Sequence, residues 1–167
     1  MQLESLLTQG LVHGFIQGEN LQTSHRGWFN VQGTHYEPAE GGGMYNDQYV
    51  AGNQTAGGQE LARESGVDKN KEIDTRLYGG GTIALEELDA LGITSEDILT
   101  KLKWFIQQLG ETARLQQDIP LQKNGDWSYR YTMTETVPTI PVQTSKEELF
   151  YKDQLVFVHF FILCSIK

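Results

Sequence analysis

The sequence holds a single cysteine and far fewer bases than acids, and each shortage argues against a class of protein. Cys164 has no second cysteine to pair with, so we expect a small buried residue in a reducing compartment. The chain has 13 Lys and Arg residues against 22 Asp and Glu, which gives a formal net charge of −9. Such a surface repels phosphate backbones and therefore disfavours nucleic acid as a partner.

Long apolar runs are also missing. The most apolar stretch, LVFVHFFILCSI, has 12 residues and is interrupted by His159, so it is too short to span a bilayer. The opening MQLESLLTQG lacks the basic start and apolar core of a signal peptide. We therefore expect a cytoplasmic protein without a membrane partner.

Motifs for cofactors and metals are absent as well. Neither a P-loop nor a G-x-S-x-G elbow occurs. Metal-ligand spacing is absent among the four histidines, which are His13, His25, His35 and His159. The spacing G-x-G-x-x-A occurs at Gly79, Gly81 and Ala84, but the preceding EIDTRLY is polar, whereas a dinucleotide site follows a buried parallel strand. We interpret these glycines as a flexible turn from strand to helix, and we expect no cofactor and no metal.

The patterning that is present is typical of one folded domain. The chain has 167 residues, 38% of them hydrophobic, which fits a single domain over residues 1–167. Helical spacing through the N-terminal segment is shown by the apolar residues Leu3, Leu7, Leu11 and Phe15. Gly10, Gly14 and Gly18 fall four apart, so this helix can approach a neighbouring element closely.

Two further parts of the chain read as strands. From Gly27 to Tyr78 the helical period disappears, and short polar–apolar segments alternate with glycine-rich turns. In the C-terminal third, Asn124-Gly125 predicts a hairpin. Residues 155–164 are apolar on both faces, which is typical of a central strand.

Residues 82–110 predict a helical pair between the two sets of strands, and its second helix begins at Thr94 or Ser95. One interpretation is a helix-turn-helix that binds DNA, but Glu96 and Asp97 would then bring carboxylates toward phosphates. We prefer a helical hairpin that covers one sheet face. The fold class is then α+β: a single domain whose antiparallel β-sheet is formed by two meanders, with an N-terminal helix and a central helical pair packed on it.

The first meander carries a polar set that suggests a site. In MYNDQYV the side chains of Tyr45, Asp47 and Tyr49 alternate and so share one sheet face. Glu60 follows in QELARES, and Tyr78 closes the meander. Carboxylates beside tyrosine hydroxyls can bind a polar ligand or act as an acid–base pair. The alternative is a solvated sheet face with cross-strand charge pairs.

We predict that the three alternating residues of MYNDQYV share a face with Glu60 and border the main concave pocket. The turn to the next strand is expected at three glycines, Gly52, Gly57 and Gly58. The competing expectation is that the tyrosines are half-buried sheet residues and that Asp47 is bridged to Arg63 or Arg76. The candidate ligand-binding residues are Tyr45, Asp47, Tyr49, Glu60 and Tyr78.

The chain resembles a family of uncharacterised bacterial domains that occur alone or as the C-terminal domain of XRE-type helix-turn-helix transcriptional regulators. The resemblance rests on MYNDQYVAGNQTAGGQELARESG, DTRLYGGGTI, NGDWSYRYTM and EELFYKDQLVFVHFFI. The positions that it selects are Tyr45, Asp47, Tyr49, Gly52, Gly58, Gln59, Glu60, Tyr78 and Gly79. The chain departs from the family's pattern at SGVDKNKEID and at VPTIPVQTSK. The family has no established activity, so the resemblance implies a sensor or ligand-binding role.

Three functions follow from these observations. The leading hypothesis is a non-catalytic, sensor-like module that binds a small molecule or a protein. The alternative is a small hydrolase or isomerase that uses Asp47 and Glu60 as a carboxylate pair. The second alternative is a DNA-binding regulator that acts through the helical pair at 82–110.

Overall fold

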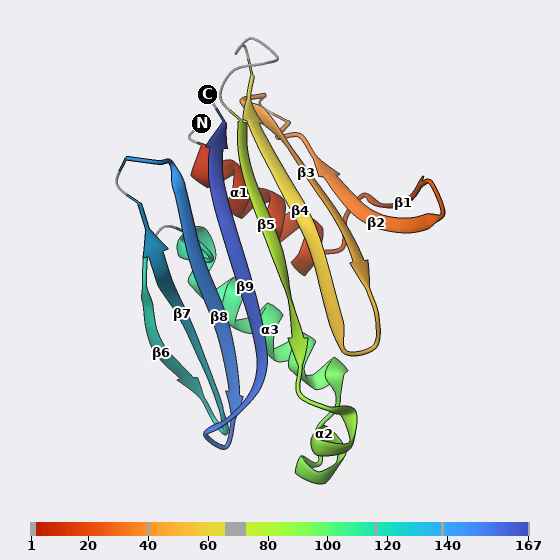
Figure 1. The fold of residues 1–167 in the computed structure, drawn as a ribbon, viewed down its shortest axis with the longest axis vertical. Coiled ribbons are helices and arrows are strands. Elements are labelled where there is room, and N and C mark those ends of the chain that lie inside the picture. Colours follow the sequence, from red (N-terminus) through yellow and green to blue (C-terminus); the bar gives the residue numbers. More distant parts are fainter. Residues whose placement is uncertain (1–2, 40, 66–72, 116, 138, 167) are drawn as a thin grey trace.

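The described residues, 3–39, 41–65, 73–115, 117–137 and 139–166, form one nine-stranded antiparallel sheet and three α-helices in this computed structural model (Figure 1). The strand order is β1-β2-β3-β4-β5-β9-β8-β7-β6. The α+β class and the antiparallel sheet expected from the sequence are confirmed.

The sheet consists of two runs of strands joined by β5 and β9. The first run contains β1 (Leu21–Arg26), β2 (Phe29–Tyr36), β3 (Gly43–Ala51), β4 (Thr55–Glu64) and β5 (Ile73–Thr82). The second contains β6 (Ile119–Asn124), β7 (Trp127–Thr136), β8 (Val142–Tyr151) and β9 (Gln154–Ile166). Within each run, consecutive strands pair with each other, and β9 returns to pair with β5. As its apolar residues on both faces predicted, β9 is a central strand, between β5 and β8.

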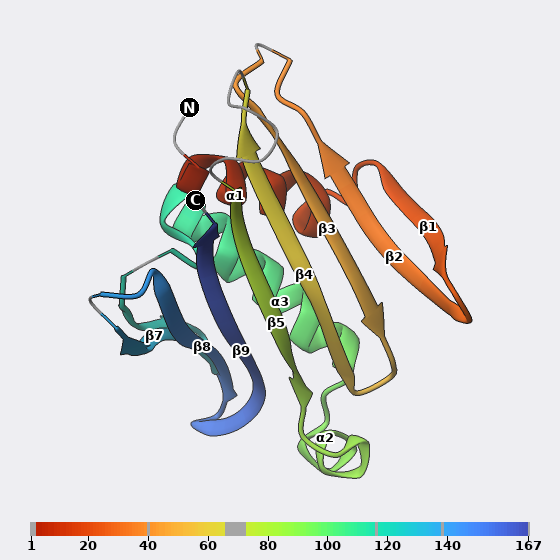
Figure 2. The same cartoon turned by 45° about the horizontal axis from the view of Figure 1, so that its top comes forward.

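Helices cover one face of this sheet. Helix α1 (Leu3–Leu11) continues into a π-helical turn, η1 (Val12–Ile16), while α2 (Leu85–Leu91), α3 (Ser95–Leu109) and the 3-10 turn η2 (Gly110–Thr112) connect the two runs. Figures 1 and 2 show α1 and α3 side by side on the same face, and α2 beyond the end of β5. The opposite face carries no helix of the described chain.

Helix α1 packs closely on β3 and β4 because it presents glycine as well as leucine. Leu6 and Leu7 are buried against Tyr45 and Ala62. A side chain at Gly10 would run into the ring of Tyr45. Glycine is therefore required where this helix crosses the sheet, as the glycine spacing in the sequence suggested.

Helix α3 has a defined start and one buried side. Thr94 caps it: the Thr94 hydroxyl accepts a hydrogen bond from the backbone N–H of Asp97, and the Asp97 carboxylate accepts one from the Thr94 backbone. The buried side consists of Ile98, Leu102, Phe105 and Ile106. This side packs on the second run of strands in the main core cluster, which includes Tyr129 and Phe157. The acidic first turn thus lies on a helix whose apolar side is occupied by the sheet.

Two local predictions are wrong, and one strand was missed. The glycines 79–81 lie within β5 rather than in a turn, and Gly57 and Gly58 lie within β4, so only Gly52 belongs to the β3–β4 turn. The cause is crowding: a side chain at Gly80 would run into the carbonyl of Val158 and the ring of His159. Strand β1 was also missed, because all six of its residues are exposed and show no apolar alternation.

Candidate functional site

A row of charged residues crosses the helix-covered face of the sheet. Asp47 on β3 lies directly opposite Glu60 on β4, and Glu60 lies opposite Arg76 on β5. All three side chains are buried. Because side chains on neighbouring strands at paired positions share a face, this register brings two carboxylates and one guanidinium together.

Glu60 is held by a complete set of partners. Arg76 donates to both carboxylate oxygens, through Nε to Oε2 and through Nη2 to Oε1 at 2.8 Å, and Tyr45 donates its hydroxyl to Oε1, also at 2.8 Å. Burial opposes ionisation of Glu60, but the Arg76 guanidinium outweighs it and holds the pKa of Glu60 below its usual value. Glu60 is therefore a fixed anion.

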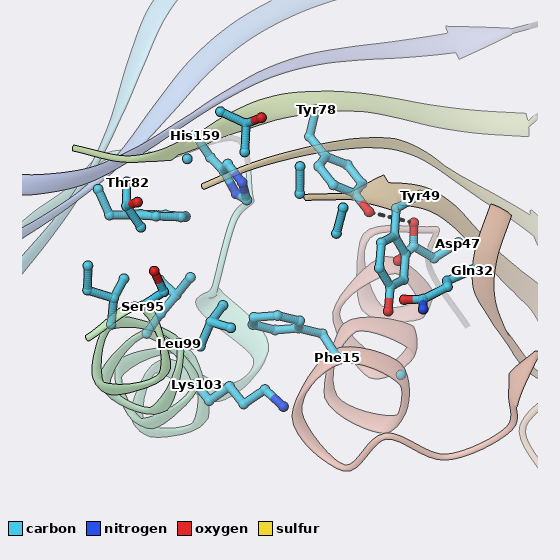
Figure 3. A pocket seen from close by; sticks show the side chains of 18 of the residues that line it. Phe15, Gln32, Asp47, Tyr49, Tyr78, Thr82, Ser95, Leu99, Lys103 and His159 are labelled. Carbon is cyan, nitrogen blue, oxygen red and sulfur yellow. Dashed lines mark hydrogen bonds between the residues drawn. The ribbon is translucent and has the colours of Figure 1, made fainter. Parts of the chain in front are cut away.

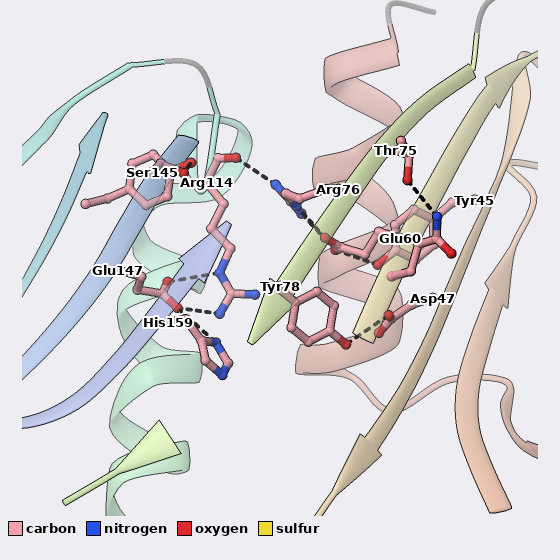
Figure 4. A network of polar contacts seen from close by, with 12 residues as sticks. Tyr45, Asp47, Glu60, Thr75, Arg76, Tyr78, Arg114, Ser145, Glu147 and His159 are labelled. Carbon is pink, nitrogen blue, oxygen red and sulfur yellow. Dashed lines mark hydrogen bonds and ion pairs between the residues drawn. The ribbon is translucent and has the colours of Figure 1, made fainter. Parts of the chain in front are cut away.

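A second buried ion pair continues this network toward the other run of strands (Figure 4). Arg114, which follows η2, donates to both oxygens of Glu147 on β8, at 2.9 and 2.6 Å. Tyr129 donates to the same carboxylate at 2.9 Å. Arg76 Nη1 donates to the backbone carbonyl of Arg114 at 2.7 Å, so the two ion pairs form one connected unit across the sheet.

Beside this unit lies a cavity of about 390 Å³ between the sheet and the helices. Its helical wall includes Leu11, Gly14 and Phe15 from α1 and η1, and Ile98, Leu99, Leu102 and Lys103 from α3. Its sheet wall includes Thr34, Asp47, Tyr49, Glu60, Tyr78, Phe157 and His159. Figure 3 shows Tyr78 and His159 on the sheet side, with Leu99, Phe15 and Lys103 opposite them. The surface of the cavity is thus mostly apolar, although polar side chains also line it, among them Gln32, Asn53, Gln54, Thr55, Thr82 and Ser95.

Asp47 is the exception among the buried charges. Its side chain is 9% exposed, and its Oδ1 accepts a hydrogen bond from the Tyr78 hydroxyl at 3.0 Å. No ion pair joins it to a cation of the described chain. Burial and the neighbouring Glu60 carboxylate raise the pKa of Asp47 to about 7. Asp47 therefore changes its charge near neutral pH.

His159 contributes a neutral ring to the same wall. Burial and the positive charge of Arg114 lower the pKa of His159 to about 4. Its Nδ1 is buried and has no hydrogen-bond partner among the described residues; the nearest carboxylate oxygen, of Glu147, is 3.8 Å away. The Tyr78 ring lies beside it, with the two ring centroids 5.8 Å apart. Tyr78 thus lies between His159 and Asp47 (Figure 3).

Glycines in β4 and β5 leave room for these side chains. A side chain at Gly58 would meet the Tyr78 hydroxyl at 2.6 Å and the Tyr49 Cβ at 2.7 Å. At Gly80 it would meet the ring of His159. The glycines that the sequence suggested as turns therefore allow three aromatic rings to lie across adjacent strands.

Most of the candidate residues predicted from the sequence lie together in the structure. Asp47, Tyr49, Glu60 and Tyr78 all lie along the cavity. Tyr45 shares their face but lies buried under α1, where it donates to Glu60 instead of lining the cavity. The alternative salt bridge to Asp47 is wrong: Arg76 pairs with Glu60, and Arg63 donates to the sulfur of Met44 at 3.2 Å.

Other functional candidates were missed. His159 had a usable signal, because alternation along β9 places it on the same face as Phe157 and Phe161, where a polar ring stands out. Glu147 had a weaker signal, because its neighbour Glu148 is also an acid and alternation alone does not say which of the two faces the helices. Arg114 had none: it lies in irregular backbone with a φ of 55°, where no period exists.

No family model, curated protein or solved structure matches this chain. The resemblance to the uncharacterised bacterial domains accordingly stays a prediction. Among the described residues, no helix has the length and apolar character needed to cross a membrane. No three His, Cys, Asp or Glu side chains of the described part come together as a metal-binding group.

Proposed function

We propose that this protein is a sensor-like module that binds a small, largely apolar molecule in the cavity between the sheet and helices α1 and α3. In this proposal the first meander and β9 form the binding face, and the helices form its cover. The proposed setting is the cytoplasm, which suits a chain with one free cysteine. The resemblance to domains of transcriptional regulators agrees with such a role.

One observation carries the proposal: the cavity wall contains buried polar atoms without protein partners. The hydroxyl of Thr34 and Nδ1 of His159 are both buried, both belong to residues that line the cavity, and neither has a hydrogen-bond partner among the described residues. Buried polar atoms in folded proteins are almost always paired, and an apolar cavity with a few such atoms is typical of a ligand site. The Asp47 carboxylate on the same wall keeps some exposed surface and is the polar group that a bound molecule would contact.

The same geometry favours binding over acid–base catalysis by Asp47 and Glu60. The two carboxylates are close, but Glu60 is fixed as an anion by Arg76 and Tyr45, so it is a poor proton donor. DNA binding through the helical pair is favoured still less, because the apolar side of α3 is occupied by the sheet.

A matched pair of variants tests the proposal. Leu99 is 45% exposed but lines the cavity, so Leu99→Trp adds bulk at its edge, whereas Gln107→Trp adds the same side chain to an exposed position of the same helix that does not line it. We expect a screen of metabolites by thermal shift to find compounds that stabilise the parent protein and Gln107→Trp but not Leu99→Trp. If every compound leaves all three proteins unchanged, or if Leu99→Trp responds like the parent, the cavity is not a ligand site.

A further inference from the structure

The charges around the cavity do not balance when Asp47 is ionised. The wall includes Glu60 and Arg114, but these two are paired with Arg76 and Glu147 respectively, at hydrogen-bond distance. His159 is neutral at physiological pH. Of the ionisable groups on the wall, Asp47 and Lys103 are left without an opposite charge from the described chain.

Lys103 is engaged elsewhere. Its ammonium lies over the ring of Phe15, 5.2 Å from the ring centroid, on the helical side of the cavity. No ion pair joins it to Asp47. In Figure 3 Lys103 and Asp47 lie on different walls, with Tyr49 and Gln32 beside the carboxylate. Asp47 is therefore the buried charge that lacks a partner.

A second unpaired group lies next to Asp47. Thr34 on β2 is its register partner across the β2–β3 pair, so the two side chains share the cavity face. The Thr34 hydroxyl is buried and has no hydrogen-bond partner among the described residues. The Thr34 hydroxyl lies against Gly14 of η1, so the Asp47 carboxylate is the group of this pair that a molecule in the cavity can reach. A carboxylate offers hydrogen-bond acceptors to a group with several N–H donors and a positive charge.

We propose that the ligand of this cavity is an apolar molecule with a protonated amine, whose nitrogen donates to the carboxylate of Asp47. This inference rests on the proposed function and adds the chemical class of the ligand. The amine takes the place of the proton that Asp47 otherwise holds, and the apolar part of the molecule contacts Leu99, Leu102 and Phe15. A carboxylic acid fits less well, because Asp47 and Glu60 present negative charge on the same wall.

Three compounds of similar shape test the inference: phenethylamine, 2-phenylethanol and 3-phenylpropionate. Isothermal titration calorimetry at pH 8 is expected to show the amine binding the parent protein about tenfold to a hundredfold more tightly than the alcohol, because a charge-assisted hydrogen bond is added. In Asp47→Asn the amine should bind no better than the alcohol. In Thr34→Val, which keeps the Asp47 carboxylate, the amine should still bind more tightly than the alcohol.

The pH dependence supplies an independent readout. The groups that face Asp47 are Glu60, Arg76, Arg114, Tyr49 and Tyr78, and none of them is expected to change charge between pH 5 and 8. Amine affinity should therefore fall about tenfold per pH unit below about pH 7, with proton release on binding, and should be constant above it. Asp47→Asn should abolish this dependence.

The outcomes separate the inference from the proposed function. Equal binding of the alcohol and the amine overturns the amine assignment but keeps the cavity as an apolar site. Tightest binding by 3-phenylpropionate, with affinity that falls as the pH rises, overturns it in favour of an acidic ligand near Lys103. Absence of binding by all three at millimolar concentration also overturns it. The metabolite screen with Leu99→Trp then tests separately whether the cavity binds any ligand.

Discussion

Asp47 and Glu60 face each other across β3 and β4, yet their surroundings lead to opposite chemistry. Both side chains are buried, and each accepts a hydrogen bond from a tyrosine hydroxyl. Glu60 also has Arg76, so its pKa is lowered; Asp47 has no such cation, so its pKa is raised to about 7. One guanidinium therefore separates a structural anion from a carboxyl group that holds its proton near neutral pH.

The largest expected effect comes from removing that guanidinium. Arg76→Met leaves Glu60 buried with only Tyr45 as a partner, and breaking a buried pair in this way costs about 3–5 kcal/mol. Urea denaturation at pH 7 measures the loss. The double variant Arg76→Met with Glu60→Gln should recover much of it, because no unpaired charge remains.

A matched control for Arg76 is Arg130, which pairs with Glu148 at 2.7 Å but is itself 43% exposed. Arg130→Met should cost only about 0–1 kcal/mol, because Arg130 is partly exposed to solvent and Glu148 keeps Lys146 as a partner at 3.0 Å. If Arg76→Met lowered the free energy of unfolding no more than Arg130→Met, Arg76 would not be the group that stabilises ionised Glu60, and the contrast with Asp47 would fail.

The next effect depends on pH. The pKa of Asp47 is about 7 in the folded protein against a usual 3.8, so the folded state keeps a proton that the unfolded state has lost. The free energy of unfolding of the parent should therefore fall between about pH 4 and pH 7 through this group, by up to about 4 kcal/mol, while Asp47→Asn lacks that fall. The lowered pKa of His159 makes the free energy of unfolding rise with pH up to about its usual pKa of 6.5, but this contribution is the same in both proteins.

The measurement is the difference in stability between Asp47→Asn and the parent at pH 5 and at pH 8. The stability of the variant relative to the parent should increase as the pH rises, because the variant never carries the unpaired charge. Parallel pH profiles for the two proteins would mean that Asp47 is ionised throughout, like Glu60.

The smallest effect comes from the two tyrosines. Tyr78→Phe removes one hydrogen bond and should cost about 1 kcal/mol. Because the Tyr78 hydroxyl stabilises the carboxylate, its loss should also raise the pKa of Asp47 further, as followed by carbon NMR of the carboxyl group. Tyr45→Phe is the counterpart at Glu60, whose pKa should stay low because Arg76 remains. A fall in the Asp47 pKa in Tyr78→Phe would contradict this account.

The sequence predicts which side chains of β3 share a face, because side chains alternate along a strand with a period of two. Alternation places Tyr45, Asp47 and Tyr49 on one face whatever their partners are. It does not reveal register, so the pairing of Glu60 with Arg76 could be suspected only as one of several charge pairs. The cavity itself depends on how the helices lie over the sheet, which no local pattern encodes.

Glycine was the other source of error. Turns and crowded strands both need glycine, in one case for backbone conformation and in the other for space. The sequence of β5 around Gly80 cannot distinguish these needs, because the crowding comes from His159, 79 positions further along the chain. Arg114 is a second case, because its contact with Arg76 depends on how the chain after α3 lies over the sheet, which the sequence around it does not reveal.

The pairing of β5 with β9 has a consequence for how the chain folds. Each run of strands can form from neighbouring hairpins, but Ile73 pairs with Ile166 and Thr82 with Phe157, so the partners are 93 and 75 positions apart. Closing such long loops costs conformational entropy before the contacts that stabilise the pair can form. We therefore expect the joining of the two runs to be the slow step of folding. During synthesis on the ribosome, β5 would remain an unpaired edge until β9 emerges, and edges of this kind are where chains associate with one another.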